Sequence, residues 1–213
     1  PNLPEVHTFC MCPGGMIVPA VDKDGEMVTN GMSFSLRNMK YANSGLVSTF
    51  FPEDFGGDRD PLAGVRFQQT YERMAYKAGG GGFVCPAQPA SDFLSNLVMK
   101  RDLEGSYPRG RRYVEMASIL PERFSKALAY ALRDWDKRLP GFAGSEAILH
   151  AVESRGSCPV RIPRNPETRQ SLSMAGLYPA GEGAGYAGGI VSAALDGIHS
   201  AKALIEAFAP RSN

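Results

Sequence analysis

A run of glycines near the end of the chain constrains the fold most. Residues 176–197 read GLYPAGEGAGYAGGIVSAALDG, and five glycines fall between positions 181 and 189. Gly183, Gly185 and Gly188 have the G-x-G-x-x-G spacing of a dinucleotide-binding turn. In a Rossmann unit, a second strand and an acidic residue about 20 positions further on must follow the helix that such a turn opens. This sequence ends at Asn213, soon after the expected helix, so we interpret the segment as a closing strand-to-helix turn.

This turn offers chemistry that suits a flavin. We expect a short buried strand at 176–180 and a helix from about 189 to 208. Because Gly188 and Gly189 lack side chains, a ligand can approach their backbone closely. Free amides at a helix N-terminus favour an electron-rich group, such as the N1–C2=O edge of a reduced flavin. The Glu182 carboxylate can accept hydrogen bonds from sugar-like hydroxyls. The alternative is a tightly packed glycine turn without a ligand.

Composition excludes several classes of protein. The 213 residues carry a formal net charge of +1, and 43% of them are hydrophobic. This charge gives no electrostatic footprint for nucleic acid or for an anionic membrane. No apolar run approaches the roughly 20 residues that span a bilayer. Four cysteines are too few for a disulfide scaffold, which favours a cytoplasmic protein. The first residue is not Met, which suggests a fragment or a processed chain.

Hydrophobic periodicity predicts a mixed α and β chain. Apolar stripes indicate helices from about Asp60 to residue 78 and from about 121 to 139. Strands are expected at 6–10, 16–20 and 45–51, the first two separated by a Pro13-Gly14-Gly15 breaker, with a loop-rich stretch at 83–113 and an extended segment at 152–162. We place a domain boundary between residues 147 and 148.

A few polar and sulfur side chains are candidates for chemistry. Cys10 and Cys12 are separated by one residue, a poor geometry for pairing with each other. Either could act in redox chemistry beside a flavin, or fill a strand as a small apolar residue. A metal site formed with His7 and a third cysteine, Cys85 or Cys158, lacks the usual ligand spacing, so we expect no metal. Asn30 and Arg161 could contact a substrate, or lie in a turn and in a surface ion pair. No G-x-S-x-G motif is present.

Several ordered stretches carry a resemblance to a known family. They are HTFCMCPGG (7–15), VTNGMS (28–33), PLAGVRFQQTYE (61–72), PAQPASDFL (86–94), SCPVRI (157–162) and the terminal segment. Together they resemble a bacterial family of poorly characterised FAD-dependent dehydrogenases, within the superfamily with two dinucleotide-binding domains. The resemblance covers the C-terminal part of such a protein, and the N-terminal turn that cradles the FAD pyrophosphate is not in this sequence.

The resemblance implies a split FAD-binding domain. Residues 1–147 would form mostly an inserted substrate or cap domain, and residues 148–213 the strand-helix return of a Rossmann-like FAD domain. Glu182 would meet the ribityl chain, with Gly181 and Gly183 beside it. Gly188, Gly189 and Ile190 would line the pyrimidine side of the isoalloxazine.

Two functions remain open at this point. The first is the C-terminal part of an FAD-dependent oxidoreductase that transfers hydride through flavin, with NAD(P) as donor or acceptor and a small-molecule substrate. Its partner would be the N-terminal FAD-binding portion of the same protein, and a homodimer is left open. The second is a non-catalytic binding or interaction domain with a degenerate flavin segment. In either case we expect the isolated chain to be inactive alone and to bind FAD poorly.

Overall fold

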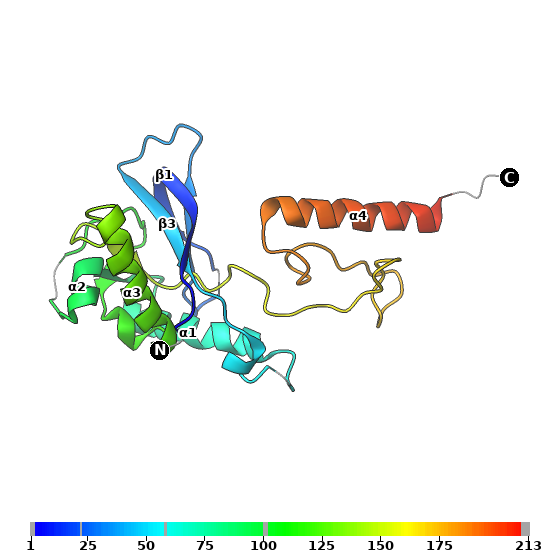
Figure 1. The fold of residues 1–213 in the computed structure, drawn as a ribbon, viewed down its shortest axis with the longest axis horizontal. Coiled ribbons are helices and arrows are strands. Elements are labelled where there is room, and N and C mark those ends of the chain that lie inside the picture. Colours follow the sequence, from blue (N-terminus) through cyan, green and yellow to red (C-terminus); the bar gives the residue numbers. More distant parts are fainter. Residues whose placement is uncertain (1–2, 22, 58, 100–101, 210–213) are drawn as a thin grey trace. The chain divides into compact units, whose positions relative to one another are not determined.

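The computed structural model describes residues 3–21, 23–57, 59–99 and 102–209 (Figure 1). They form two compact units. Unit 1 consists of Pro1–Phe51 and Arg66–Ser154, and unit 2 of Pro52–Val65 and Arg155–Asn213. The expected mixed α and β architecture is confirmed. The assignment of substrate and flavin roles to particular parts of the chain stays a prediction.

Unit 1 begins with a three-stranded antiparallel sheet in the order β2-β1-β3. Its strands are β1 (His7–Pro19), β2 (Thr29–Ser33) and β3 (Tyr41–Val47). The Pro13-Gly14-Gly15 stretch does not separate two strands as predicted, because β1 runs through it with shifts of register against β3. Gly14 adopts φ +52°, and a Cβ there would lie 1.9 Å from the Arg37 carbonyl oxygen. The strand therefore bulges where it was expected to end. The expected strand at 45–51 is also misplaced, since β3 ends at Val47.

A second small sheet holds the centre of unit 1. The middle strand β4 (Cys85–Pro89) pairs in parallel with β5 (Arg111–Tyr113) and antiparallel with β6 (Ile148–His150). All five residues of β4 are buried. The helix α2 (Ala90–Ser95) follows β4 directly. The prediction of a loop-rich stretch at 83–113 is therefore wrong. Pro86 and Pro89 concealed a buried central strand, because proline is depleted from such strands.

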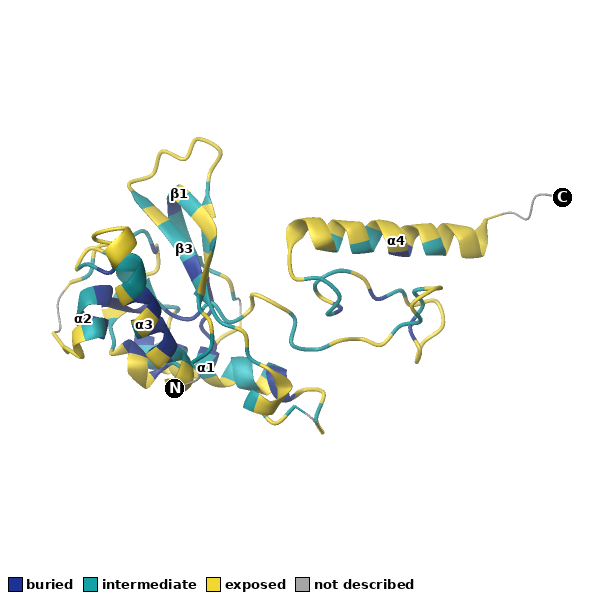
Figure 2. Ribbon diagram, in the orientation of Figure 1, coloured by how far each residue is buried: buried dark blue, intermediate teal, exposed yellow. Residues whose placement is uncertain are grey.

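Two long helices supply much of the core of unit 1. α1 (Ala63–Gly79) contributes its residues from Arg66 onward to this unit, and α3 (Glu122–Arg138) belongs to it entirely. Both confirm the predicted apolar periodicity. Leu128 and Leu132 of α3 are almost completely buried, in a core that also contains Met27, Ala75, Cys85, Phe93, Tyr107 and Met116. Burial of each such leucine stabilises the fold by roughly 1.5–3 kcal/mol. Figure 2 shows the buried stripe of α3 beside α2.

Unit 2 contains little regular structure. It holds the 3-10 turn η1 (Pro52–Asp54), the start of α1 as far as Val65, and the helix α4 (Ile190–Phe208). From Arg155 to the start of α4 the chain is irregular, with one isolated bridge between Arg164 and Ser171. The helix confirms the prediction for residues 189–208. The expected strand at 176–180 is not formed, and Leu177 in it is exposed. The segment 152–162 also forms no strand.

The helix α4 leaves much of its apolar side uncovered in the structure. Ile190 is 92% exposed, Val191 72% and Phe208 73%, and most of the helix is exposed (Figure 2). Despite this apolar character, no described helix is both long and apolar enough to cross a membrane.

Candidate functional site

The glycine-rich turn of unit 2 folds on itself just before α4. The Gly185 N–H donates to the Glu182 carbonyl oxygen at 2.8 Å, and the Tyr186 N–H donates to the Gly181 carbonyl oxygen at 3.0 Å. Gly181 and Gly185 adopt φ of +71° and +80°, a region that suits glycine. These bonds make a compact turn over 181–186, and the backbone continues from it into the first turn of α4.

A half-buried carboxylate anchors this turn to α4. Asp196 accepts bidentate hydrogen bonds from Arg164, from Nη2 at 2.6 Å and from Nη1 at 2.8 Å. It also accepts from Arg169 Nη1 at 2.7 Å and from the Gly181 N–H at 2.8 Å. The side chains of Arg164 and Asp196 are only 7% and 12% exposed. The Arg164 hydrogen bonds, helped by Gly181 and Arg169, hold the pKa of Asp196 well below its usual range.

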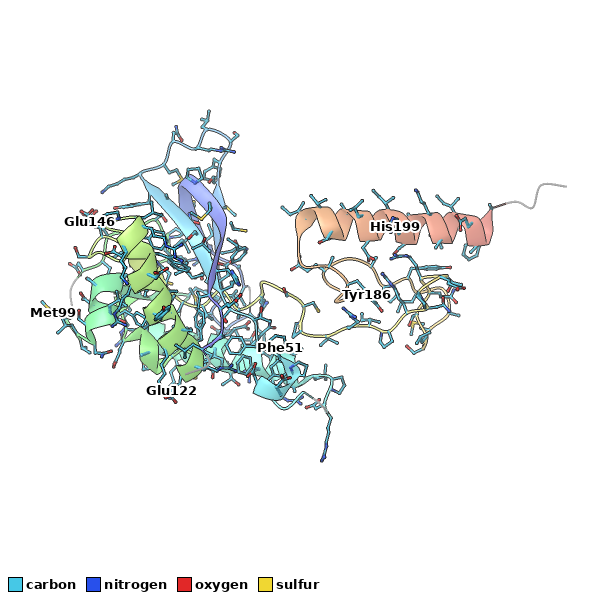
Figure 3. All side chains as sticks on the ribbon, in the orientation of Figure 1. Phe51, Met99, Glu122, Glu146, Tyr186 and His199 are labelled. Atoms are coloured by element: carbon cyan, nitrogen blue, oxygen red, sulfur yellow. The ribbon has the colours of Figure 1, made fainter. Side chains whose placement is uncertain are left out.

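Tyr186 organises the other side of the turn. Its hydroxyl donates to the Ile162 carbonyl oxygen at 3.0 Å and accepts from the Arg164 N–H at 3.1 Å. The Arg164 guanidinium lies 3.6 Å from the centre of its ring, and that of Arg161 5.0 Å. Figure 3 shows Tyr186 in the irregular chain next to α4. The ring therefore ties the 161–164 segment to the glycine turn.

Arg161 serves the fold at this point. Its Nε donates to the Gly185 carbonyl oxygen at 2.9 Å. A Cβ on Gly185 would lie 2.5 Å from the Val160 carbonyl oxygen and 2.8 Å from the Arg161 Cα. Gly185 is therefore required by close backbone contact with residues 160–161, so its lack of a side chain is explained without a ligand.

The end of the turn has the opposite character. A Cβ on Gly188 would meet only Ser157 Oγ at 3.8 Å, and one on Gly189 only Ser192 Oγ at 3.6 Å, both ordinary contacts. Gly188, Gly189 and Ile190 are exposed. The first N–H groups of α4, from Ile190 onward, have no partner within the helix. This edge therefore offers open space, amide donors and the positive end of a helix dipole, which is what the electron-rich edge of a flavin ring requires.

The structure brings together all the candidates predicted in the terminal segment. Gly181, Glu182 and Gly183 lie in the turn at 181–186, which Arg161 contacts at Gly185, and Gly188, Gly189 and Ile190 follow it at the start of α4. Gly183 has open space around it, since a Cβ there would meet no atom within 4 Å. Glu182 is half-buried and uses its backbone carbonyl in the turn. The turn thus fits the group that the resemblance implies at its ring edge.

The remaining candidates lie in unit 1. Cys10 and Cys12 are on β1, and Asn30 is an exposed residue of β2 that pairs with Val18. Val18, the β1 partner of Asn30, lies six positions along the strand from Cys12. In the described part of the chain, no three His, Cys, Asp or Glu side chains gather as a metal site would need.

Sequence reasoning missed the residues that hold the turn in place. Asp196 and Arg164 are 32 positions apart, and Arg169 lies in a polar loop. The available signal was Asp196 itself, an acid between Leu195 and Ile198 in the apolar part of a helix. A lone acid at such a position needs a buried partner.

Comparison with known proteins identifies the family. A family model described as "FAD-dependent protein, C-terminal domain-like" matches residues 2–156. The chain belongs to this FAD-dependent protein family. The match ends within two residues of the end of unit 1 at Ser154, and it also covers residues 52–65 of unit 2. The glycine turn and α4 lie outside the matched residues.

A relative covers the terminal segment as well. An uncharacterised protein from Clostridium beijerinckii (strain ATCC 51743 / NCIMB 8052) is 45% identical over 205 residues. The alignment covers 95% of this chain but 38% of that protein. The chain thus spans well under half the length of this relative.

Proposed function

We propose that this chain is the C-terminal part of an FAD-dependent oxidoreductase and that the turn 181–190 contacts the flavin. Membership of the FAD-dependent family supports the cofactor. The observation that carries the placement is the open edge at Gly188 and Gly189, next to the free amides of α4. Glu182 would hold ribityl hydroxyls, while Gly188, Gly189 and Ile190 would face the pyrimidine edge of the ring.

In this function the protein positions the flavin and stabilises the negative charge that develops on it. Bound flavin supplies hydride chemistry, with NAD(P) as a partner in electron transfer. The Gly188 amide and the first amides of α4 stabilise negative charge at the ring edge that they face, while the Gly189 N–H donates to Ser192 Oγ at 3.1 Å and caps the helix. The Asp196 anchor keeps these amides in place, because it ties Gly181 to α4 before any ligand binds. Such preorganisation lowers the cost of ordering the turn on binding.

Two proteins test the cofactor assignment. The longer Clostridium beijerinckii relative should purify with the visible absorption of an oxidised flavin, or acquire it on addition of FAD. The 213-residue chain should bind FAD much more weakly in the same titration. A relative that is colourless and takes up no added FAD would refute the proposal that this chain is part of an FAD-dependent oxidoreductase.

A chimera tests the turn itself. Residues 155–213 of this chain, grafted in place of the aligned segment of the relative, allow Gly188→Val to be compared with Gly197→Val. Gly188 lies on the proposed flavin edge, whereas Gly197 lies within α4 with open space around it. We expect Gly188→Val to weaken FAD binding by roughly tenfold or more, about 1.4 kcal/mol, and Gly197→Val to leave it within a factor of about two. Equal affinities would remove the turn from the flavin site.

The exposed apolar side of α4 favours the second function, a non-catalytic interaction domain. Ile190, Val191 and Phe208 are the kind of residues that protein interfaces cover. The two functions differ in a simple way. If the chain is an interaction domain without a cofactor, the relative should stay colourless with added FAD. In the chimera, Gly188→Val should then leave the affinity for the protein partner unchanged.

A further inference from the structure

Two cysteines of unit 1 lie at an irregularity of β1. Phe9 pairs with Gly45 and Cys12 pairs with Asn43, so three steps along β1 match two steps along β3. Cys10 and Met11 form the bulge that absorbs the extra residue. Cys10 adopts φ +48° there, a conformation that usually selects glycine. The same strand uses a glycine, Gly14 with φ +52°, at its next shift of register.

The bulge changes what the spacing of the two cysteines permits. In a regular strand, alternate residues are separated by two rises, or about 6.6 Å between Cα atoms. This distance is at the upper limit of the range in which a disulfide forms. A bulge with a left-handed residue bends and shortens the strand locally. The separation of a regular strand therefore does not describe Cys10 and Cys12.

The surroundings differ for the two thiols. Cys12 lines an open hollow together with Met11, Pro13, Ser33, Phe34 and Arg37. Cys10 is exposed, Cys12 is half-buried, and both are reduced in the structure. Burial, the Glu153 carboxylate and the neighbouring Cys12 raise the pKa of Cys10. Cys12 lines the hollow together with Arg37, whereas Cys10 is not among the residues that line it, so Cys12 is the sulfur that a disulfide held in the hollow meets first.

We propose that Cys10 and Cys12 form a redox-active dithiol that reduces small disulfides carrying a carboxylate. The apolar side chains of Met11 and Phe34 would contact the body of such a compound, and Arg37 its carboxylate. Nothing in the flavin proposal depends on this site, and it does not depend on flavin.

The exchange balances in two steps. The Cys12 thiolate attacks one sulfur of RSSR; that S–S bond breaks, and the leaving thiolate takes a proton to become RSH. The mixed disulfide at Cys12 is then attacked by Cys10, which loses its proton, and the second RSH leaves. The dithiol is oxidised by two electrons to a Cys10–Cys12 disulfide, and RSSR is reduced to two RSH.

The test uses 5,5′-dithiobis(2-nitrobenzoate), an aromatic disulfide with a carboxylate on each half, at one equivalent per chain. All variants carry Cys158→Ser, since Cys158 is half-buried and could react. Cys85 is fully buried and its pKa is raised to about 12, so it stays silent. The dithiol should release two thionitrobenzoates per reagent and give a chain that has lost two hydrogen atoms and carries no adduct.

Single variants separate the roles. With Cys10→Ser the reagent should release one thionitrobenzoate and leave a stable adduct on Cys12. With Cys12→Ser the reaction should slow by roughly tenfold, because Cys10 does not line the hollow that would hold the reagent. If the chain that retains both Cys10 and Cys12 keeps a stable adduct and releases only one thionitrobenzoate, the proposal is overturned. Trp135 fluorescence checks that each variant is folded.

Arg37→Met tests the substrate class. The rate with the dianionic reagent should fall by roughly tenfold at low salt, and the rate with neutral 2-hydroxyethyl disulfide should stay within about twofold. Equal slowing of both reagents would show that Arg37 acts only on the fold, and it would remove the carboxylate from the proposal.

Discussion

Acid should destabilise unit 1 through one histidine. His150 lies on β6, where Nδ1 is 3.0 Å from the Ile148 carbonyl oxygen, and buried Nε2 has no hydrogen-bond partner among the described residues. Burial lowers the pKa of His150 to about 4, with the Arg111 cation acting in the same direction. Protonation would place a second charge beside that cation without an acceptor for the new N–H. The folded protein therefore keeps this imidazole neutral.

The magnitude follows from the gap between the folded and unfolded pKa values. An unfolded histidine titrates near 6.5, so as the pH falls the unfolded chain takes up the proton first. The stability that the neutral ring contributes is fully present above about pH 6.5 and is lost as the pH falls through about 4. Between pH 7 and pH 4 this amounts to a loss of about 3 kcal/mol from this group alone.

Urea unfolding followed by Trp135 fluorescence measures this loss. Trp135 is the single tryptophan of the chain and packs edge-on against Phe142 in unit 1, with ring centres 5.7 Å apart. The comparison is with His150→Asn, which does not titrate and keeps a donor near Ile148. Other groups titrate equally in both chains, so the wild type should lose about 3 kcal/mol more than His150→Asn on going from pH 7 to pH 4.

An exposed histidine provides the control. The His7 side chain is 62% exposed, so His7→Asn should leave the wild-type pH dependence unchanged. If the wild type and His150→Asn lose stability in parallel, His150 is not held neutral by burial, and the packing argument for β6 is refuted.

Two further substitutions test the anchor of the glycine turn. Asp196→Asn removes the negative charge that two arginines and the Gly181 N–H share, so it should destabilise unit 2 by about 3 kcal/mol. Faster amide exchange over residues 178–189 measures this loss. As a control, Asp134→Asn, which removes an exposed ion pair with Arg138, should change the exchange little. Gly185→Ala should cost at least about 2 kcal/mol, because its Cβ would clash with backbone at φ +80°. Gly176→Ala has a similar φ but open space, so it should cost about 1 kcal/mol; equal exchange rates in the two glycine variants would contradict the close contact.

The parts of the fold that depend on local pattern could be predicted from the sequence. α1 and α3 each bury a stripe with helical spacing, so the chain itself carries the signal. β4 carries no such signal, because five buried residues that include two prolines show neither alternation nor a typical strand composition. Its pairing with β5 and β6 depends on residues far away in the chain, which no local pattern reveals.

The candidate site also contains features that a local pattern predicts and features that depend on residues far apart in the chain. The glycine turn and the helix after it are local features, and both were predicted. The Asp196 anchor joins residues 32 positions apart, and its partner Arg164 lies in a loop whose sequence gives no periodicity. The Cys10 bulge was also beyond prediction, because a left-handed cysteine depends on the register of β1 against β3.

The structure assigns different causes to glycines that look equivalent in the sequence. Gly185, the middle glycine of the G-x-G-x-x-G spacing, is required by contact with the backbone of residues 160–161. Gly183 and Gly188, at the two ends of the spacing, have no such requirement. The G-x-G-x-x-G spacing therefore combines a glycine that the fold requires with two glycines that the fold does not require. The glycine that serves the fold should tolerate no side chain whether or not cofactor is present, whereas those that face open space should tolerate one until a ligand must approach. Stability measurements on the free chain and affinity measurements on the flavin-loaded chimera thus report on different members of one motif.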